Sequence, residues 1–443
     1  MTSLWAAQET RISLSHLASA IKNTNYKHPF HKEQEMPVAS SPTFLCSELP
    51  VRYTHILRLL STMSPDALRS PIIRYVAHSY LHDICTLLHP SLQSTSDQAF
   101  RNMLKRLRQR QAANLIRLRY ALSAFPVLMD NINTISFGIH ILLDQHLSWS
   151  DKNGNQTQVV NPIDVASTAI QDARATCSAA LGKPSPEIHL VPKAAADDRR
   201  ELTFIPNLLH RIIYESTLVT LKAHIARQQK QELLQGKRHS WLRTILKRGS
   251  EEEPIAMHVF GGPTSVGFRL TSSAPLLPSD LQAGIPRDPL GIPTCASVLS
   301  QTKANTVEKD DHYPEGLVEW EAMSGWRSAQ ALASHFGGNL DVVSVDGLGT
   351  SVYLALDRDA ALLERYPSRS LSSAHRLLRH HGRISAAAAA AAATTASPLT
   401  LQAASVQLDT FLSAIANPGL NNIHPTPLHH HHSVSLSAAV GHA

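Results

Sequence analysis

Apolar residues recur at steps of three and four through the first third of the chain, the spacing that places them on one face of an α-helix. Three such segments cover residues 44–65, 70–90 and 100–124, and a fourth covers residues 126–149. Several of them stop at a proline, where helices commonly end. Four amphipathic helices in series predict an up-and-down helical bundle over residues 41–155.

From residue 156 to residue 360 the pattern changes to helices that alternate with short strands. DKNGNQ (151–156) is rich in turn-forming residues and marks the predicted boundary between the two parts. Helical patterns cover residues 160–180, 204–229 and 326–336. Alternating apolar residues around glycines predict two hairpins, at residues 255–271 and 340–356. Helices laid over a mixed sheet form an α/β layer.

The remainder, residues 361–443, is predicted to be a low-complexity tail that buries little. It contains an alanine run (386–393) and a histidine run (429–432). A histidine run can bind a metal ion adventitiously. No other residue near it has ligand spacing, so biased composition is the preferred interpretation.

Composition narrows the class of protein. The formal charge is +6, and the excess lies in two stretches, 105–111 and 369–383, without interleaved aromatic residues. This favours solvated helix faces over a nucleic-acid surface. The four cysteines form no CxxC pair, which argues against a disulfide framework or a cysteine-bound metal. No apolar run is long enough for a membrane span, and residues 1–40 are at most a weak presequence and lead-in.

Two places in the second half of the chain can carry chemistry. The turn DGLGT (346–350) either directs backbone amides at a phosphate or is an ordinary hairpin turn. Glu215 and Val219 are one turn apart in the helical pattern of residues 204–229, so they share a face. A glutamate in an apolar helix is either a base or the solvent edge of the apolar stripe, and spacing alone does not decide between the two.

Five segments together resemble one family. In chain order they are ELPVR (48–52), TISFGIHILLDQH (134–146), VNPIDVASTAIQDARATC (160–177), FIPNLLHRIIYESTLVTLKA (204–223) and HFGGNLDVVSVDGLGTSVYLAL (335–356). Their content and order resemble the mitochondrial α-keto-acid dehydrogenase kinases, that is, the pyruvate dehydrogenase kinases and the branched-chain keto-acid dehydrogenase kinases. The resemblance covers about residues 10–358. It implies an N-terminal four-helix bundle followed by a GHKL (Bergerat) ATPase-like α/β sandwich.

The resemblance also implies an activity and partners. Members of this family use ATP and Mg²⁺ to phosphorylate serines on the dehydrogenase component of a keto-acid dehydrogenase complex in the mitochondrial matrix. They dock on lipoyl domains of the complex and form dimers, so a homodimer or a heterodimer with a related kinase is expected. The pyruvate and branched-chain complexes are not separated by the resemblance, although the ELPVR segment leans slightly towards the branched-chain type.

The same resemblance assigns site positions. Two are catalytic: Glu215, expected to orient or deprotonate the acceptor hydroxyl, and His146, at the end of the fourth helical segment. The nucleotide-binding positions are Val219, Lys222, Ser272, Met323, Gly325, Gly349 and Thr350.

Several of these positions depart from the family pattern. Val219 stands where the family has an asparagine whose oxygen holds Mg²⁺, and an isopropyl group cannot ligate a metal. Ser272 stands where the family has the aspartate that reads the adenine amino group. The glycine-rich phosphate loop corresponds to Glu321, Met323 and Gly325, so one glycine of three is kept. We therefore predict no metal ligand at Val219 and weak or absent use of ATP.

Three hypotheses stay open inside the family. The chain is a serine/threonine kinase with a divergent nucleotide site, or a pseudokinase that regulates by dimerisation or by binding the dehydrogenase complex. The third hypothesis is a genuine kinase whose sequence is scrambled around residues 272–324 by an incorrect gene model. Outside the family, a helical scaffold of unrelated function predicts no nucleotide pocket beside Glu215.

Overall fold

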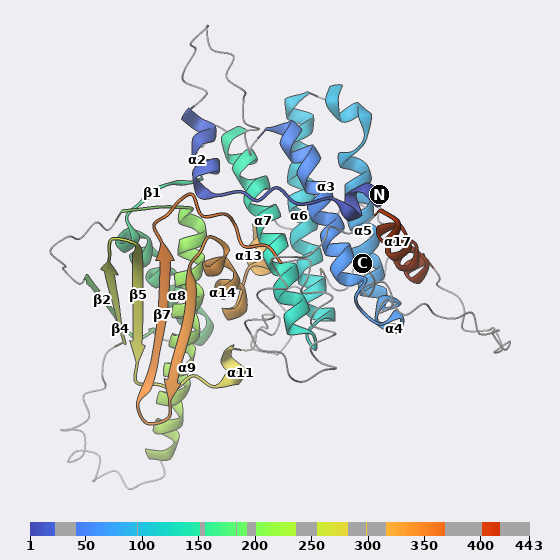
Figure 1. Ribbon diagram of the computed structural model, residues 1–443. Coiled ribbons are helices and arrows are strands. Elements are labelled where there is room, and N and C mark those ends of the chain that lie inside the picture. The colour runs from blue at the N-terminus through green and yellow to red at the C-terminus, as the bar shows by residue number, and fades with distance from the viewer. Residues whose placement is uncertain are drawn as a thin grey trace, which may run out of the picture.

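The computed structural model describes residues 1–22, 41–94, 96–150, 156–182, 184–192, 201–235, 255–281, 298, 316–367 and 401–416. Within them the chain forms a helical layer and a sheet with helices on one of its faces (Figure 1). The predicted mixed architecture, helices first and an α/β part after them, is confirmed. No helix in this described part is long and apolar enough to cross a membrane. The turn-rich residues 151–155, the alanine and histidine runs and the basic stretch 369–383 lie outside the described residues.

Four long helices build the helical layer: α3 (Pro42–Leu60), α5 (Pro71–Leu87), α6 (Asp97–Ala121) and α7 (Pro126–Ser150). Each packs against two of the others, in the cyclic order α3, α5, α6, α7. Local sequence starts these helices, because Ser41 and Ser96 accept hydrogen bonds from backbone amides three residues on. Proline also occupies the first turn of α3 and α5. The connections include α4 (Pro65–Leu68) and a 3₁₀ turn, Pro90–Ser94.

The sheet has five strands in the order β2–β4–β5–β7–β6. These strands are β2 (Ile188–Pro192), β4 (Ile255–Gly261), β5 (Ser265–Ser272), β6 (Asn339–Val345) and β7 (Gly349–Asp357). β2 runs parallel to β4, and the other neighbours are antiparallel. Two further strands, β1 (Gln158–Val160) and β3 (Leu202–Phe204), pair with each other. The two hairpins predicted from the glycine-bounded apolar runs are therefore present as β4–β5 and β6–β7.

Three helices lie on one face of the five-stranded sheet: α8 (Pro162–Leu181), α9 (Pro206–Gln235) and α14 (Trp326–His335) (Figure 1). α14 also contacts α7, and α13 (Leu317–Ala322) contacts α6, so these two helices join the sheet to the helical layer. The other sheet face keeps apolar side chains exposed. They are Val191, Phe260, Val343, Val345 and Tyr353.

The low-complexity tail predicted from residue 361 needs correction for one segment. α17 (Leu401–Ala416) is a helix whose side chains Ala404, Leu408, Phe411 and Ile415 are buried on one face. It packs beside α1 (Thr2–Ala6), where the rings of Trp5 and Phe411 lie 5.8 Å apart (Figure 1). The start of the predicted lead-in also contributes to the core. Trp5 on α1 and Leu17 on α2 (Leu14–Lys22) are fully buried. Apolar periodicity within the alanine-rich composition explains the helix.

A buried ion-pair cluster ties the ELPVR segment to Glu364, which follows β7. Arg52 Nε lies 2.9 Å from Glu48 Oε1, and its Nη1 donates a 3.1 Å hydrogen bond to Glu364 Oε2. His335 Nε2, at the end of α14, lies 3.2 Å from the same Glu364 oxygen. Burial by itself would raise the pKa of Glu364, but Arg52 and His335 lower it to about 2. The cluster therefore holds the helical layer, α14 and residue 364 together as one unit.

Candidate functional site

A cavity of about 920 Å³ lies between α9 and the segments that follow β5 and precede α14. One face of α9 forms its longest wall, because the lining residues of this helix recur at three- and four-residue steps. They are Glu215, Leu218, Val219, Lys222, Ala223, Ala226, Arg227 and Lys230. The facing wall consists of Pro275, Leu276, Leu277, Asp280, Gly325, Trp326, Ser344, Asp346 and Gly347.

The local sequence positions α9 with this face outward. Pro206 begins the helix, and Ile205 accepts hydrogen bonds from the amides of Leu208 and Leu209. The side chains of Leu209 and Ile212 are fully buried, and α9 packs against α8 and α14. The apolar side of the helix is thus anchored in the core, and the side with Glu215 turns to the cavity.

Glu215 is held in an ion pair with the residue one turn before it. Its Oε1 lies 2.9 Å from Arg211 Nη2, and both side chains are almost completely buried. Arg211 also donates hydrogen bonds to the backbone oxygens of Trp320, at 2.6 Å, and Met323, at 3.4 Å. Its guanidinium carbon lies 3.6 Å from the centroid of the Trp320 ring. Glu215 is therefore the counter-ion of an arginine that fastens α13 to α9.

Burial lowers the pKa of the Arg211 guanidinium below its ordinary value, and the charge of Glu215 opposes this shift. An arginine stays protonated under all ordinary conditions. The carboxylate of Glu215 consequently faces a permanent positive charge at contact distance, and its negative charge is already neutralised by the protein.

Val219 and Lys222 line the cavity on the same stripe as Glu215. Val219 is partly buried against the core and offers no oxygen, as the sequence predicts. Within the described residues, no cluster of three His, Cys, Asp or Glu side chains is placed to hold a metal ion. The residues present at this position therefore do not fit Mg²⁺, which requires oxygen ligands in near-octahedral geometry.

Ser272 does not line the cavity. It ends β5, is 7% exposed, and lies 3.3 Å from His224 Nδ1 through its hydroxyl. The same hydroxyl accepts a 3.2 Å hydrogen bond from the amide of Ala274. The structure thus uses Ser272 to shape the turn after β5 and to contact α9.

Gly349 and Thr350 hold that turn from the other side. Gly349 has φ = +93°, and a Cβ placed there would lie 2.2 Å from the backbone oxygen of Ser272. The Thr350 hydroxyl donates to the Ala274 oxygen at 2.7 Å and accepts from the Leu276 amide at 3.1 Å. Gly347, in the same turn, is the glycine that reaches the cavity wall.

The predicted phosphate-loop positions Met323 and Gly325 differ in whether they line the cavity. Gly325 lines the cavity, caps α14 and has φ = +93°. Met323 is partly buried and does not line the cavity, because Arg211 holds its backbone oxygen on the opposite side. Of the predicted nucleotide-binding positions, Val219, Lys222 and Gly325 border the cavity, and Ser272, Met323, Gly349 and Thr350 support its walls.

His146 belongs to the helical layer and is not among the residues that line this cavity. It is 4% exposed, and its ring stands edge-on to Phe100, in the first turn of α6, at 5.5 Å. The sequence pattern did not single out Arg211, which pairs with Glu215, or Trp320, whose ring packs on the Arg211 guanidinium. Arg211 was detectable from its i, i+4 spacing to Glu215. Trp320 was not, since only the tertiary fold brings α13 onto α9.

Comparison with known proteins finds similarity to mitochondrial dehydrogenase kinases. Residues 11–164 match the family model described as mitochondrial branched-chain alpha-ketoacid dehydrogenase kinase. This match covers the helical layer and the start of α8, and it ends before the cavity on α9.

Individual relatives extend the comparison. A mitochondrial [pyruvate dehydrogenase (acetyl-transferring)] kinase of Arabidopsis thaliana is 24% identical over 352 residues, which are 74% of this chain and 87% of that protein. The corresponding kinase of Schizosaccharomyces pombe is 22% identical over 53% of this chain and 51% of its own length. Isozyme 3 of the mouse is 24% identical over 50% of this chain and 60% of its own length.

Proposed function

The chain belongs to the mitochondrial α-keto-acid dehydrogenase kinase family, and from this premise we propose that it regulates a keto-acid dehydrogenase complex by binding rather than by phosphoryl transfer. The observation that supports the proposal is the buried Arg211–Glu215 ion pair, one helical turn before Val219.

The ion pair engages the carboxylate that a kinase would use as its base. A general base has to reach the acceptor hydroxyl with a carboxylate oxygen. Glu215 Oε1 instead contacts Arg211, and both side chains are almost completely buried. The carboxylate of Glu215 therefore pairs with Arg211, and Arg211 in turn holds α13 through the Trp320 backbone oxygen.

The cavity also departs from the family at two positions that the resemblance assigns to the nucleotide and its metal. Phosphoryl transfer depends on metal ions and donors that neutralise charge on the phosphates. Val219 supplies no metal ligand, and Ser272 faces His224 instead of the cavity. Of the positions that the resemblance assigns, Lys222 and Gly325 remain on the walls, and Arg227 and Lys230 add two further cations there.

The rest of the proposal concerns architecture and partners. We take the helical layer as the family's four-helix bundle, and the sheet with α8, α9 and α14 as its GHKL module. The protein works in the mitochondrial matrix on the dehydrogenase complex, where it meets the dehydrogenase component and lipoyl domains. The exposed apolar sheet face around Val343 and Tyr353 supports a dimer with a second copy or with a related kinase.

Calorimetric titration of the whole chain with ATP and ADP, with and without Mg²⁺, tests this function. The expected result is weak or undetectable binding that does not depend on Mg²⁺, together with no phosphate transfer to a dehydrogenase component. Tight binding that requires Mg²⁺ would overturn the proposal.

A restored metal ligand gives a sharper form of the same test. Val219→Asn alone and with Ser272→Asp should restore little binding, because the Arg211–Glu215 pair and the absent loop glycines remain. Leu218→Asn, which adds the same side chain at the neighbouring position on the cavity wall, is the matched control.

A kinase with a divergent site is the second candidate, favoured by the survival of a 920 Å³ cavity beside Glu215. It predicts phosphate transfer that Glu215→Gln abolishes. If such transfer is measured in the unmodified chain, this candidate replaces the first.

A further inference from the structure

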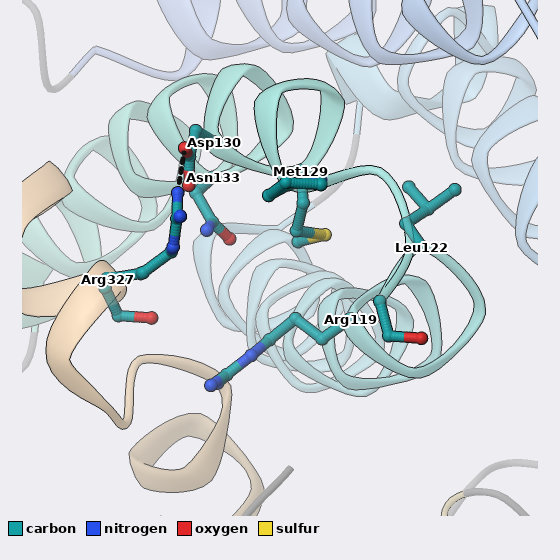
Figure 2. Close-up of a pocket in the computed structure, with 9 residues that line it drawn as sticks. Arg119, Leu122, Met129, Asp130, Asn133 and Arg327 are labelled. Carbon is teal, nitrogen blue, oxygen red and sulfur yellow. Dashed lines mark hydrogen bonds and ion pairs between the residues drawn. The ribbon is translucent and has the colours of Figure 1, made fainter. Parts of the chain in front are cut away.

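Two cavities border α14, and they differ in whether their cations are already paired. The smaller one, of about 260 Å³, lies where α6, α7 and α14 meet (Figure 2). There Asp130 Oδ2 lies 2.8 Å from Arg327 Nη1. Arg119 donates hydrogen bonds to the backbone oxygens of Ala322 and Ser324. Both guanidinium groups are therefore engaged by the protein itself.

The larger cavity, of about 920 Å³, carries three cations on one face of α9, and two of them are unpaired. The three are Lys222, Arg227 and Lys230. Arg227 donates a hydrogen bond to the backbone oxygen of Ser273. Lys222 and Lys230 are exposed, and they form no hydrogen bond or ion pair with any residue that the structure describes. These two ammonium groups are available to bind an anion.

The carboxylates of the same walls leave one positive charge in excess. Glu215 is neutralised by Arg211, and the walls add Asp280 and Asp346. Three cations thus face two carboxylates. A single negative charge on a ligand balances the walls. The several charges of a triphosphate without its metal would exceed this balance and repel the two aspartates.

The remainder of the cavity is mainly apolar. Eight of its lining residues have no polar side-chain group that could pair with a charge: Leu218, Val219, Ala223, Ala226, Pro275, Leu276, Leu277 and Trp326. Along α9, the distance from Val219 to Lys230 is about 16 Å, at 1.5 Å for each residue. A ligand that fills this space therefore has an elongated apolar body beside its charged end.

The volume sets an upper limit on that body. Since one water molecule takes about 30 Å³ in the liquid, the cavity has room for a molecule of roughly 30 non-hydrogen atoms. A saturated fatty acid of about 10 to 16 carbons fits within this limit.

We propose that this cavity binds the carboxylate of such a fatty acid, without a metal ion. The carboxylate pairs with the ammonium groups of Lys222 and Lys230, and the alkyl chain lies along α9 towards Val219 and Trp326. A fatty alcohol fits less well, because it leaves both ammonium groups without a counter-ion. A short carboxylate such as acetate leaves the apolar walls uncovered. The inference rests on the proposed function, since a chain that does not hold ATP with Mg²⁺ leaves the cavity open to another ligand.

The primary experiment is calorimetric titration of the whole chain with decanoate. A ligand of this size is expected to bind with a dissociation constant on the order of 0.1 mM. Affinity should rise about fourfold for each methylene that the walls bury, so decanoate should bind at least about fourfold more tightly than octanoate. Decyltrimethylammonium has the same chain and the opposite charge, and it should bind at least about tenfold more weakly.

Variants with matched controls place the binding in this cavity. Lys222→Gln should weaken decanoate binding at least about fivefold, which corresponds to one ion contact in water. Arg106→Gln, which removes an exposed cation from α6, should leave it unchanged. Ala226→Trp fills the cavity without changing its charge and should weaken binding at least about tenfold. Ala179→Trp, on the exposed side of α8, should not.

Lys222 and Ala226 are exposed on α9, so both variants are expected to fold. The proposal is overturned if decanoate gives no saturable binding, if decyltrimethylammonium binds as tightly as decanoate, or if either variant leaves the affinity unchanged. Absence of decanoate binding overturns this inference and leaves the proposed function standing. Tight ATP binding that requires Mg²⁺ overturns the proposed function and this inference with it.

Discussion

The same pair of residue types, a glutamate and an arginine four residues apart on a helix, is buried in two regions of this molecule. In α3, Glu48 and Arg52 join Glu364 and the backbone oxygen of Thr10. In α9, Arg211 and Glu215 join the backbone oxygens of α13 and the ring of Trp320. The first pair does not line the 920 Å³ cavity, whereas Glu215 of the second pair does. The pair on α9 therefore has the same bonding pattern as the structural pair on α3, although Glu215 borders a cavity.

The two arginines differ in the number of carboxylates that pair with them. Arg52 is completely buried between two carboxylates, so its loss removes the guanidinium that Glu48 and Glu364 share. Arg211 faces one carboxylate, and Glu215 borders a cavity that water can enter. The physical expectation is that α3 is the more sensitive of the two, and the four changes below test this ranking.

Arg52→Met should give the largest effect. Removing one member of a buried charge cluster costs about 5 kcal/mol, at the upper end for such changes, because Glu48 and Glu364 stay buried without the guanidinium that they share. Urea unfolding measures the loss. Arg69→Met, which breaks an exposed ion pair, should change stability by less than about 0.5 kcal/mol.

Acid should release the same cluster through Glu364. Its pKa in the folded protein is about 2, below the ordinary value of 4.5, so its stabilising contribution is complete above pH 4.5 and is lost as the pH falls towards 2. The total is about 3 kcal/mol. Burial raises the pKa of Glu48, so that residue does not carry this acid dependence. Unfolding free energies of the parent chain and Glu364→Gln between pH 5 and 2 test it; parallel curves would contradict the assignment.

Arg211→Met should cost about 2 kcal/mol, less than Arg52→Met, because cavity water can solvate the Glu215 carboxylate that is left behind. The double variant with Glu215→Leu should recover part of this loss, since no unpaired charge remains. Denaturant unfolding of the two single variants and the double variant gives the coupling energy. Independent, additive losses would mean that the ion pair contributes nothing of its own.

Glu215→Gln should have the smallest effect, about 1 kcal/mol, because Arg211 keeps its two backbone acceptors and the Trp320 ring. Under the binding function it should also leave regulation of the dehydrogenase complex intact. A regulatory assay with the isolated complex decides this, and loss of regulation with an unchanged fold would return Glu215 to a catalytic role.

Much of the fold follows from local sequence. The apolar periods of α3, α5, α6 and α7, and the glycine-bounded hairpins, are strong enough to be read without tertiary information. α17 was missed because alanine-rich composition suggested a segment without a core, although Leu408, Phe411 and Ile415 share one helical face.

The residues of the candidate site also differ in how far local sequence determines their position. Glu215, Val219 and Lys222 line one cavity because helical spacing alone fixes their common face. Ser272 and Met323 lie in turns, where orientation depends on contacts from distant elements. His224 holds the Ser272 hydroxyl, and Arg211 holds the Met323 backbone. Such contacts between distant elements are not encoded in the local sequence pattern. The pattern therefore does not predict which atoms of Ser272 and Met323 face the cavity.

The pairing of α1 with α17 has a consequence for the order of events during synthesis. Trp5 Nε1 donates a hydrogen bond to Gln407, a residue 402 positions later in the chain. The partner that covers Trp5 is therefore absent from the growing chain until the 402 positions between Trp5 and Gln407 have been synthesised. During that interval the tryptophan ring cannot be buried against Phe411, as it is in the folded protein.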